Sequence, residues 1–149
     1  MRVWKRAVKA VAVCGVAAGT IFAGAAWAVG GSSPTQVSRA EITIDGFSIA
    51  TFQRCMVATE VDAPGEIRCE RGMTNDLSLS SWHDAAQSGD LAAARKDFTL
   101  IMYDTTGDPV ARWSATDGYP TELTMYFDED GFGREIATIS AAEVQRVSP

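Results

Sequence analysis

The chain has 149 residues, of which 46% are hydrophobic and 21% charged. It is therefore long enough for one globular domain and too apolar for a solvated, disordered polymer. The net charge of −6 conceals an asymmetry, because the first nine positions hold four basic and no acidic residues. From Val29 onward there are nine basic against 19 acidic side chains, a net of −10. Such a surface repels phosphate backbones, which argues against a nucleic-acid partner bound by charge.

The N-terminal segment has the composition of an export leader. A basic start is followed by an apolar stretch, with no charged residue between Lys9 and Arg39. The sequence AWA fits the small-x-small cleavage pattern, which places the cut after Ala28. The run is also long enough for one membrane span, so an uncleaved anchor is the alternative. We expect residues 1–28 to be a signal peptide or membrane anchor and the only part to contact a membrane. The protein would then be exported or membrane-anchored, and assembly would be cytoplasmic only if this prediction is wrong.

The start of the folded domain is marked by a change in composition. Residues 29–39 are rich in Gly and Ser and hold no large apolar cluster, which predicts a linker followed by a domain over residues 40–149. Apolar residues alternate on both sides of Asp45-Gly46, a strong hairpin signal that predicts two strands joined there. The turn cluster DAPG begins at Asp62 and precedes a third short strand, EIRCERG.

A helix is predicted after the third strand. Thr74 is a suitable N-cap residue, Asp76 places negative charge in the first turn, and Gly89 is a typical stop. One side of this helix is apolar at helical spacing. That side consists of Leu79, Trp82 and Ala86. A further short helical turn is expected between residues 90 and 96.

The remainder of the chain is predicted to be β-structure in two hairpins. Strands over residues 97–104 and 109–115 flank the turn TTGD, and strands over residues 121–127 and 133–147 flank the turn DEDGF. Four strands after one main helix, with two or three strands before it, predict an α+β domain that is mostly antiparallel β.

The only histidine, His83, is the one candidate for a catalytic base. A nucleophile–base pair needs convergent geometry and normally a third, orienting group. Ser80 is the nearby hydroxyl that shares a helical face with His83, and no glycine-rich nucleophile turn surrounds it. We therefore interpret His83 as a boundary residue on a packing helix and predict no catalytic residue and no enzyme activity.

No metal site or cofactor is predicted. One histidine cannot build a histidine-based site, and Cys55 and Cys69 lack the close spacing of zinc ligands. The acidic stretches DTTGD and DEDG do not have the ligand spacing of a calcium loop and are better explained as turns. Trp82 and Trp113 are not clustered with basic residues, so we expect them to pack in the core rather than stack on bases.

Cys55 and Cys69 are candidates for a disulfide. If their strands form a hairpin centred on Asp62, Cys55 faces Cys69, Met56 faces Arg68 and Val57 faces Ile67. Opposite positions in a non-hydrogen-bonded pair have the Cα separation that a disulfide needs, and an exported protein meets an oxidising compartment. The alternative is a pair of reduced, buried cysteines in a cytosolic protein.

Two long stretches, ERGMTNDLSLSSWHDAA and ARKDFTLIMYDTTGDPVARW, together with a Tyr-Pro pair, resemble the tail-tube proteins of contractile bacteriophages and related bacterial contractile injection systems. The opening hairpin, ITIDGFSIATF, is also similar, so the resemblance covers residues 40–147. In that family an Arg-Gly pair ends a strand, a Trp lies on the helix, and an Asp-x-x-Gly turn precedes a strand. The matching positions are Arg71, Gly72, Trp82, Lys96, Asp97, Asp104, Gly107, Pro109, Val110, Arg112, Trp113 and Pro120.

The resemblance implies a tail-tube-like β-barrel or β-sandwich subunit with one main helix packed outside. It also implies a non-enzymatic structural protein that forms hexameric rings with copies of itself and has sheath or baseplate proteins as further partners. The chain departs from the family in two ways. Only residues 59–66 replace a longer loop used between rings, so we expect stacking to be weaker than ring closure. Family members normally lack an export signal, so the alternative function is an exported or membrane-anchored β-rich interaction module derived from the tube fold.

Overall fold

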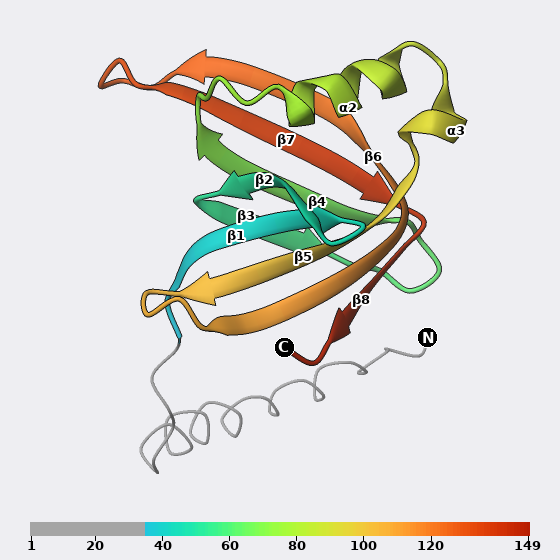
Figure 1. Ribbon diagram of the computed structural model, residues 1–149, viewed down its shortest axis with the longest axis horizontal. Helices are drawn as coiled ribbons and strands as arrows, with labels where there is room; N and C mark the ends of the chain where they lie inside the picture. Colours follow the sequence, from blue (N-terminus) through green and yellow to red (C-terminus); the bar gives the residue numbers. More distant parts are fainter. Residues whose placement is uncertain (1–34) are drawn as a thin grey trace, which may run out of the picture. The chain divides into compact units, whose positions relative to one another are not determined.

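The computed structural model describes residues 35–149, which form two β layers and two short helices (Figure 1). The predicted leader with its cleavage position at Ala28, and the predicted linker up to residue 34, lie outside the described residues. Within residues 35–149, no helix is long and apolar enough to span a membrane. The first strand begins at Val37, so the last residues of the predicted linker are part of the sheet.

The domain is mainly antiparallel β with one main helix, as predicted. Its elements are β1 (Val37–Ile44), β2 (Phe47–Phe52), β3 (Arg54–Ala58), β4 (Gly65–Gly72), α2 (Ser78–Gln87), α3 (Leu91–Ala94), β5 (Lys96–Asp104), β6 (Pro109–Phe127), β7 (Gly133–Ala141) and β8 (Glu143–Val147). Two strand boundaries were predicted wrongly. Residues 109–115 and 121–127 belong to one strand, β6, and the predicted strand over residues 133–147 is divided at Ala142 into β7 and β8.

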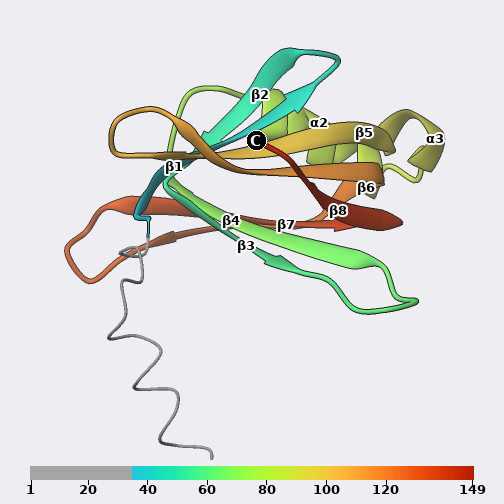
Figure 2. The ribbon, with the colours of Figure 1, turned by 90° about the horizontal axis from the view of Figure 1, so that it is seen from below.

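The sheet is folded into two layers, and β6 belongs to both (Figure 2). Layer A has the strand order β2-β1-β5-β6-β8, and layer B has the order β6-β7-β4-β3. The first part of β6 pairs with β5 and β8, and its second part pairs with β7. The sheet stays open, so of the two predicted alternatives a single chain forms the sandwich and not a closed barrel. A barrel would require hydrogen bonds between β2 and β3, the two end strands of the path.

The passage of β6 between the layers depends on two residues at its bend. Asp117 has a φ of 52°, and its amide donates a hydrogen bond of 3.0 Å to the carboxylate of Asp97. A side chain on Gly118 would overlap the ring of Phe98, so the close approach of β5 requires glycine there. The segment TDGYP, which separates the two predicted strands, is therefore a bend within a continuous strand.

Both early hairpins have the predicted pairing. Asp45 and Gly46 have φ values of 52° and 82°, as a tight turn between β1 and β2 requires. In the β3–β4 hairpin Cys55 is opposite Cys69, and the two neighbouring pairs also have the predicted register. The register prediction is therefore confirmed for this hairpin.

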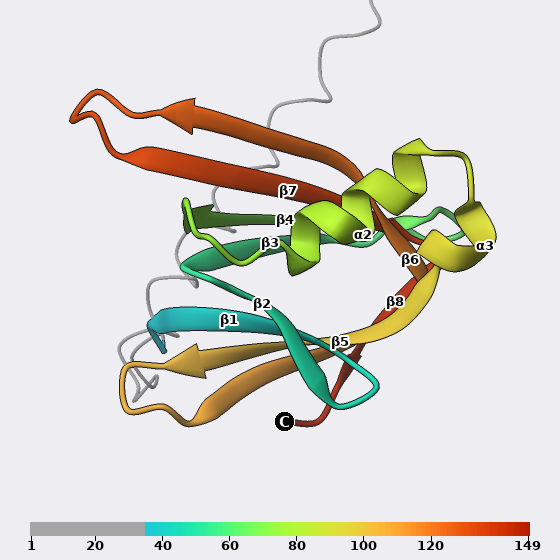
Figure 3. The ribbon, with the colours of Figure 1, turned by 45° about the horizontal axis from the view of Figure 1, so that its top comes forward.

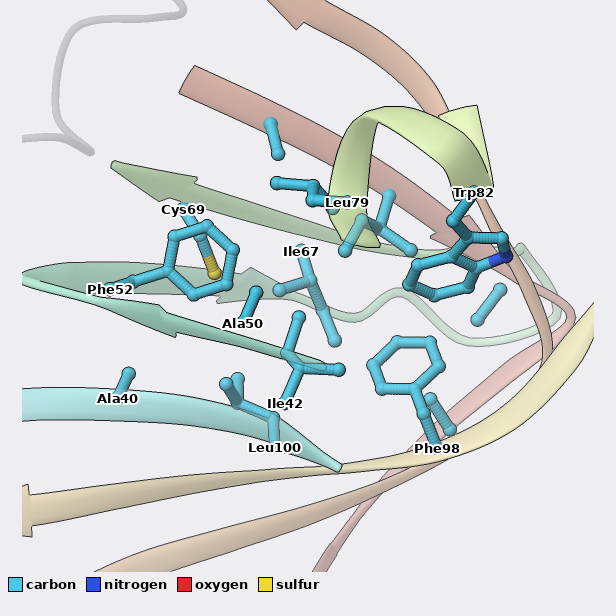
Figure 4. Close-up of a cluster of buried hydrophobic side chains, with 14 of the residues drawn as sticks. Ala40, Ile42, Ala50, Phe52, Ile67, Cys69, Leu79, Trp82, Phe98 and Leu100 are labelled. Carbon is cyan, nitrogen blue, oxygen red and sulfur yellow. The ribbon is translucent and has the colours of Figure 1, made fainter. Parts of the chain in front are cut away.

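The core lies between the layers and is closed on one side by α2 (Figures 3 and 4). Ile42 and Leu100 contribute from layer A, and Ile67 and Ile139 from layer B. Helix α2 adds Leu79 and Trp82.

Trp82 connects the helices to the sheet. Its ring meets that of Phe98 edge to face, with centroids 5.8 Å apart and planes at 78°. Its Nε1 donates a 2.5 Å hydrogen bond to the carbonyl oxygen of Ala94 in α3. A single side chain thus fixes both helices relative to β5, which agrees with the prediction that Trp82 packs in the core.

The ends of α2 only partly match the prediction. Gly89 follows the helix with a φ of 87°, which confirms the predicted stop. The prediction of Thr74 as N-cap was wrong, since the helix begins at Ser78. The Thr74 hydroxyl accepts from the amide of Asp76, and the Asp76 carboxylate accepts from the amide of Ser78, so both residues form a turn ahead of the helix.

Truncation of Trp82 should therefore be costly. We expect Trp82→Ala to lower the free energy of unfolding by about 3–5 kcal/mol, the usual range for loss of a buried aromatic side chain. Leu77→Ala removes an exposed side chain just before the same helix and should cost less than about 0.5 kcal/mol. Urea denaturation of both variants measures the difference, and equal losses would contradict the role of Trp82.

Candidate assembly surface

The most prominent feature of layer B is its two free edges. Neighbouring strands in the order β6-β7-β4-β3 all run antiparallel. Within the described chain the second part of β6 pairs only with β7, and β3 pairs only with β4. Each edge therefore presents unpaired backbone N–H and C=O groups, which can accept a further strand.

Exposed apolar side chains lie beside one of these edges. In the β6–β7 hairpin, Met125, Phe127 and Phe132 are 53%, 73% and 66% exposed. Met73 is 49% exposed, and its side chain lies so close to Gly133 that a Cβ there would overlap it. Adjacent apolar side chains left open to water are typical of an interaction surface.

The outer face of layer B, which points away from the core, is polar with apolar patches. Arg54 forms a 2.5 Å ion pair with Glu70, and the Tyr126 hydroxyl lies 3.5 Å from the same carboxylate group. Met56 on this face is 66% exposed. By strand alternation the charged residues of the face are Arg54, Arg68, Arg134, Glu66, Glu70 and Glu122. Positive and negative charges are therefore balanced on this face, although the chain as a whole is acidic.

Cys55 and Cys69 lie on the edge strand β3 and its neighbour β4. They are directly opposite each other, their Cα atoms are 4.1 Å apart, and a disulfide joins them. Cys69 is buried in the core and Cys55 is half-buried against it. The bridge holds the edge strand β3 to the rest of layer B.

The family-motif residue Arg71 forms a buried ion pair. Arg71 and Glu135 face each other on β4 and β7, and the Arg71 Nε donates to Glu135 Oε2. Both residues are at least 95% buried, and the guanidinium also lies 5.6 Å from the centre of the Phe52 ring. Sequence reasoning missed Glu135. The sequence does carry a signal for Glu135, because this acidic residue falls at an inward-facing position of β7, like Ala137 and Ile139.

The Asp-x-x-Gly motif is a turn, as expected. The Asp104 carboxylate accepts hydrogen bonds from the amides of Thr106 and Asp108, at 2.9 and 3.0 Å, and from the Thr106 hydroxyl at 2.7 Å. These bonds, led by that to Thr106, lower the pKa of Asp104. Gly107 has a φ of 94°, which favours glycine there.

The acidic turn of the β6–β7 hairpin is built in a similar way. Its Asp128 carboxylate accepts from the amides of Phe132 and Asp130 and from the Arg134 Nε, and these bonds lower the pKa of Asp128. The carboxylates of both turns are thus used to hold the backbone.

The remaining motif positions lie on strands β4, β5 and β6. Pro120 is fully buried in β6, and Trp113 packs against the core from the same strand. Gly72 ends β4 and lines a surface hollow beside the β6–β7 turn. The other matching positions, Lys96, Asp97, Pro109, Val110 and Arg112, lie on or at the start of β5 and β6.

His83 lies on α2, and its side chain is 19% exposed. Its Nδ1 is 4.0 Å from a carboxylate oxygen of the exposed Asp84. Within residues 35–149 no hydrogen bond joins His83 to Ser80, although both lie on the same helix. His83 therefore lies at the border of the packed side of α2.

Unpaired strand edges and exposed apolar side chains together are typical of a surface for association. The model of the T4-like virus tail tube protein gp19 family matches residues 55–140. This match covers more than half of the chain and includes layer B, both helices and β5. The chain belongs to the tail tube protein family, whose members are structural proteins and not enzymes.

Solved structures have the same fold. The anti-feeding prophage baseplate, 6-fold symmetrised, matches with a TM-score of 0.52 and 13% identity, covering 80% of this chain and 97% of that chain. Hcp1 from Flavobacterium johnsoniae matches with a TM-score of 0.52 and 18% identity, covering 74% and 95%. The sheath–tube complex of the extracellular contractile injection system PVC in its extended state gives 0.52 and 15%, covering 78% and 93%. At these identities the likeness shows the fold alone. Comparison of the sequence with curated proteins gives no match.

The Arg71–Glu135 pair can be tested by a double-mutant cycle. Arg71→Met alone leaves the Glu135 carboxylate buried without its partner and should cost about 3–5 kcal/mol of unfolding free energy. Arg71→Met combined with Glu135→Leu removes both charges and should recover at least about half of that loss. Urea denaturation of the single and double variants gives the coupling, and strictly additive losses would show that the pair does not act as a unit.

Proposed function

We propose that this protein is the repeating subunit of a tail tube and that six copies form a closed ring. The observation that carries the proposal is the four-stranded, alternating layer B with a free edge on each side. If copies are related by rotation about a ring axis, each β3 lies beside the β6 of the next copy. Because the layer has an even number of alternating strands, those two strands run antiparallel. Repeating this pairing around the ring removes every free edge of layer B.

The same arrangement decides which face of layer B would line the central bore of the ring. Layer A and both helices lie on one side of layer B, so only the opposite, outer face can turn toward the axis without a clash. That face has equal numbers of Arg and Glu side chains, together with the exposed Met56. The bore would then have a wall of balanced charge, and the acidic excess of the chain would lie on the outside. The number six is supported by the 6-fold symmetrised anti-feeding prophage baseplate, which has the same fold.

Ring formation can be measured directly. We expect residues 29–149 to form six-fold rings, visible by electron microscopy and matched by a hexamer mass in light scattering at micromolar concentration. A protein that stays monomeric at every concentration would contradict the proposed ring. It would favour the alternative, an exported or membrane-anchored interaction module that kept the fold.

Proline substitutions on β6 provide a matched control for this experiment. Thr124 and Met125 are successive residues, so one amide points to β7 and the other to the free edge. Proline at the residue whose amide faces the free edge should leave a folded monomer and abolish rings, because it removes a donor needed only by the neighbour. Proline at the other residue should reduce stability by itself. Circular dichroism separates the two effects.

Sheath and baseplate proteins are proposed as further partners. Two of the matching folds come from a sheath–tube complex and a baseplate. Layer A and α2 would form the outer wall of the ring and so offer the surface for such partners. Absence of any sheath or baseplate protein from assemblies purified from the native host would contradict this.

We also propose that the subunit is exported or membrane-anchored and that its disulfide forms outside the reducing cytoplasm. The leader composition and the pairing of Cys55 with Cys69 support the proposal. Protein isolated from its native host should begin at Val29 and show no free thiol after denaturation. Its reduction should lower the unfolding free energy by about 2–4 kcal/mol. Two titratable thiols from Cys55 and Cys69 would mean cytoplasmic assembly, whereas an N-terminus that retains Arg2 together with an intact disulfide would mean that the leader is an uncleaved anchor.

A further inference from the structure

Strand β3, one of the two edges that the proposed ring pairs, is held to the domain by few buried side chains. Within the described chain it pairs with β4 alone. Between residues 53 and 64 only Cys55 and Val57 are not fully exposed, and both are half-buried against the core. The turn that follows the strand, residues 59–64, is exposed throughout. An edge strand with so little buried surface is the part of a sheet that opens most readily.

The polar contacts of β3 add little to this attachment. In the ion pair with Glu70 the Arg54 side chain is 75% exposed, and pairs of exposed charges contribute little to stability. Just ahead of the strand, the exposed Gln53 accepts a hydrogen bond of 2.7 Å from Arg134. Both contacts lie at the start of β3, so neither holds the end that leads into the turn.

The disulfide is the only covalent cross-link of β3 within residues 35–149. Cys69 on β4 is 1% exposed and lies in the core, so the bridge ties the middle of β3 to a fixed position (Figure 4). The two cysteines are 14 positions apart, and the bridge closes the loop between them. It restricts the open conformations of this loop and so makes opening of β3 less favourable. Without the bridge, β3 keeps its backbone hydrogen bonds to β4 and only Val57 as an anchored apolar side chain.

We propose that this disulfide is a redox switch for assembly. The oxidised subunit presents an ordered β3 edge and closes into rings, whereas the reduced subunit stays monomeric. This inference rests on the proposed ring, in which each β3 pairs with the β6 of the next copy. A strand that is ordered only part of the time binds its partner with an affinity reduced by that fraction, and each seam of the ring uses one β3. Rings would then form only after the chain has left a reducing compartment.

The switch is set by thiol–disulfide exchange with an oxidant that carries a disulfide. The thiolate of Cys55, the more exposed of the two cysteines, attacks one sulfur of the oxidant and releases the other as a thiolate. The Cys69 thiolate then attacks the Cys55 sulfur of the mixed disulfide and releases the second thiolate of the oxidant. In all, the two cysteines lose two protons and two electrons, and the oxidant is left as two thiols.

The coupling between oxidation and assembly acts in both directions. If oxidation favours the ring, then ring formation must favour the oxidised state by the same factor. In the ring the β6 of the neighbouring copy would lie along β3 and oppose its opening. A closed ring would therefore keep its disulfides at reductant concentrations that reduce the monomer.

The concentration at which rings form tests the switch in protein purified after expression of the full chain. Electron microscopy and light scattering should show rings of the oxidised protein, and reduction with dithiothreitol should raise the protein concentration that rings require at least about tenfold. Cys55→Ser combined with Cys69→Ala should behave like the reduced protein, with or without reductant. Cys14→Ser, at a position outside the described residues, keeps the bridged pair and should respond to reductant like the unchanged protein.

Two further measurements show whether the effect is local to β3. In the reduced monomer the amides of residues 54–58 that bond to β4 should exchange with solvent at least about tenfold faster than those of β5 and β7. The dithiothreitol concentration that reduces half of the bridges should be at least about tenfold higher in rings than in dilute monomer. Equal ring formation by oxidised and reduced protein, or loss of the whole sheet on reduction, would overturn this inference and leave the ring standing. Oxidised protein that forms no rings at any concentration would overturn the proposed function and this inference together.

Discussion

The bend of β6 is the constraint on which the rest of the structure depends. One strand of 19 residues pairs first with β5 and β8 and then with β7, so it fixes the two layers relative to each other. The bend is possible because Gly118 allows the Phe98 ring to approach and because Asp97 holds the amide of Asp117. The core then fills the space between the layers, and Trp82 places the helices over its open side. A sandwich built in this way leaves layer B with two unpaired edges.

Those edges are what the proposed ring would pair. Exposed edge strands are an aggregation hazard unless they are covered, twisted away or paired. Here the edge strand β3 is held by a disulfide, and the other edge is the second part of β6, where Met125 and Phe127 are exposed. Neither edge is protected by an inward-pointing charge or a proline within its unpaired stretch. The simplest way to satisfy both edges is a second copy, because the alternating strand order makes each edge the antiparallel partner of the other.

Much of the fold could be predicted because the signals were local. The Asp-Gly turn, the β3–β4 register and the stop of α2 at Gly89 depend on backbone conformations that few residues adopt, and all three are as predicted. The errors arose where local chemistry competed with long-range packing. TDGYP has turn composition, yet pairing with β5 and β7 on either side keeps β6 continuous. Thr74 is a good cap, yet the Met73 amide is bonded to the carbonyl of Gly133 and a turn at Thr74 and Asp76 follows, so the helix begins only at Ser78.

By itself the sequence determined the α+β class, the disulfide register, the structural role of α2 and the resemblance to tail-tube proteins. It did so because alternation, turn residues and family motifs are properties of short segments. Only the tertiary structure decided which face of each strand is covered. Met125 and Phe127 alternate like core residues, but the layer above them ends too early to bury them. Glu135 reads as an ordinary charged residue until Arg71 is placed opposite it.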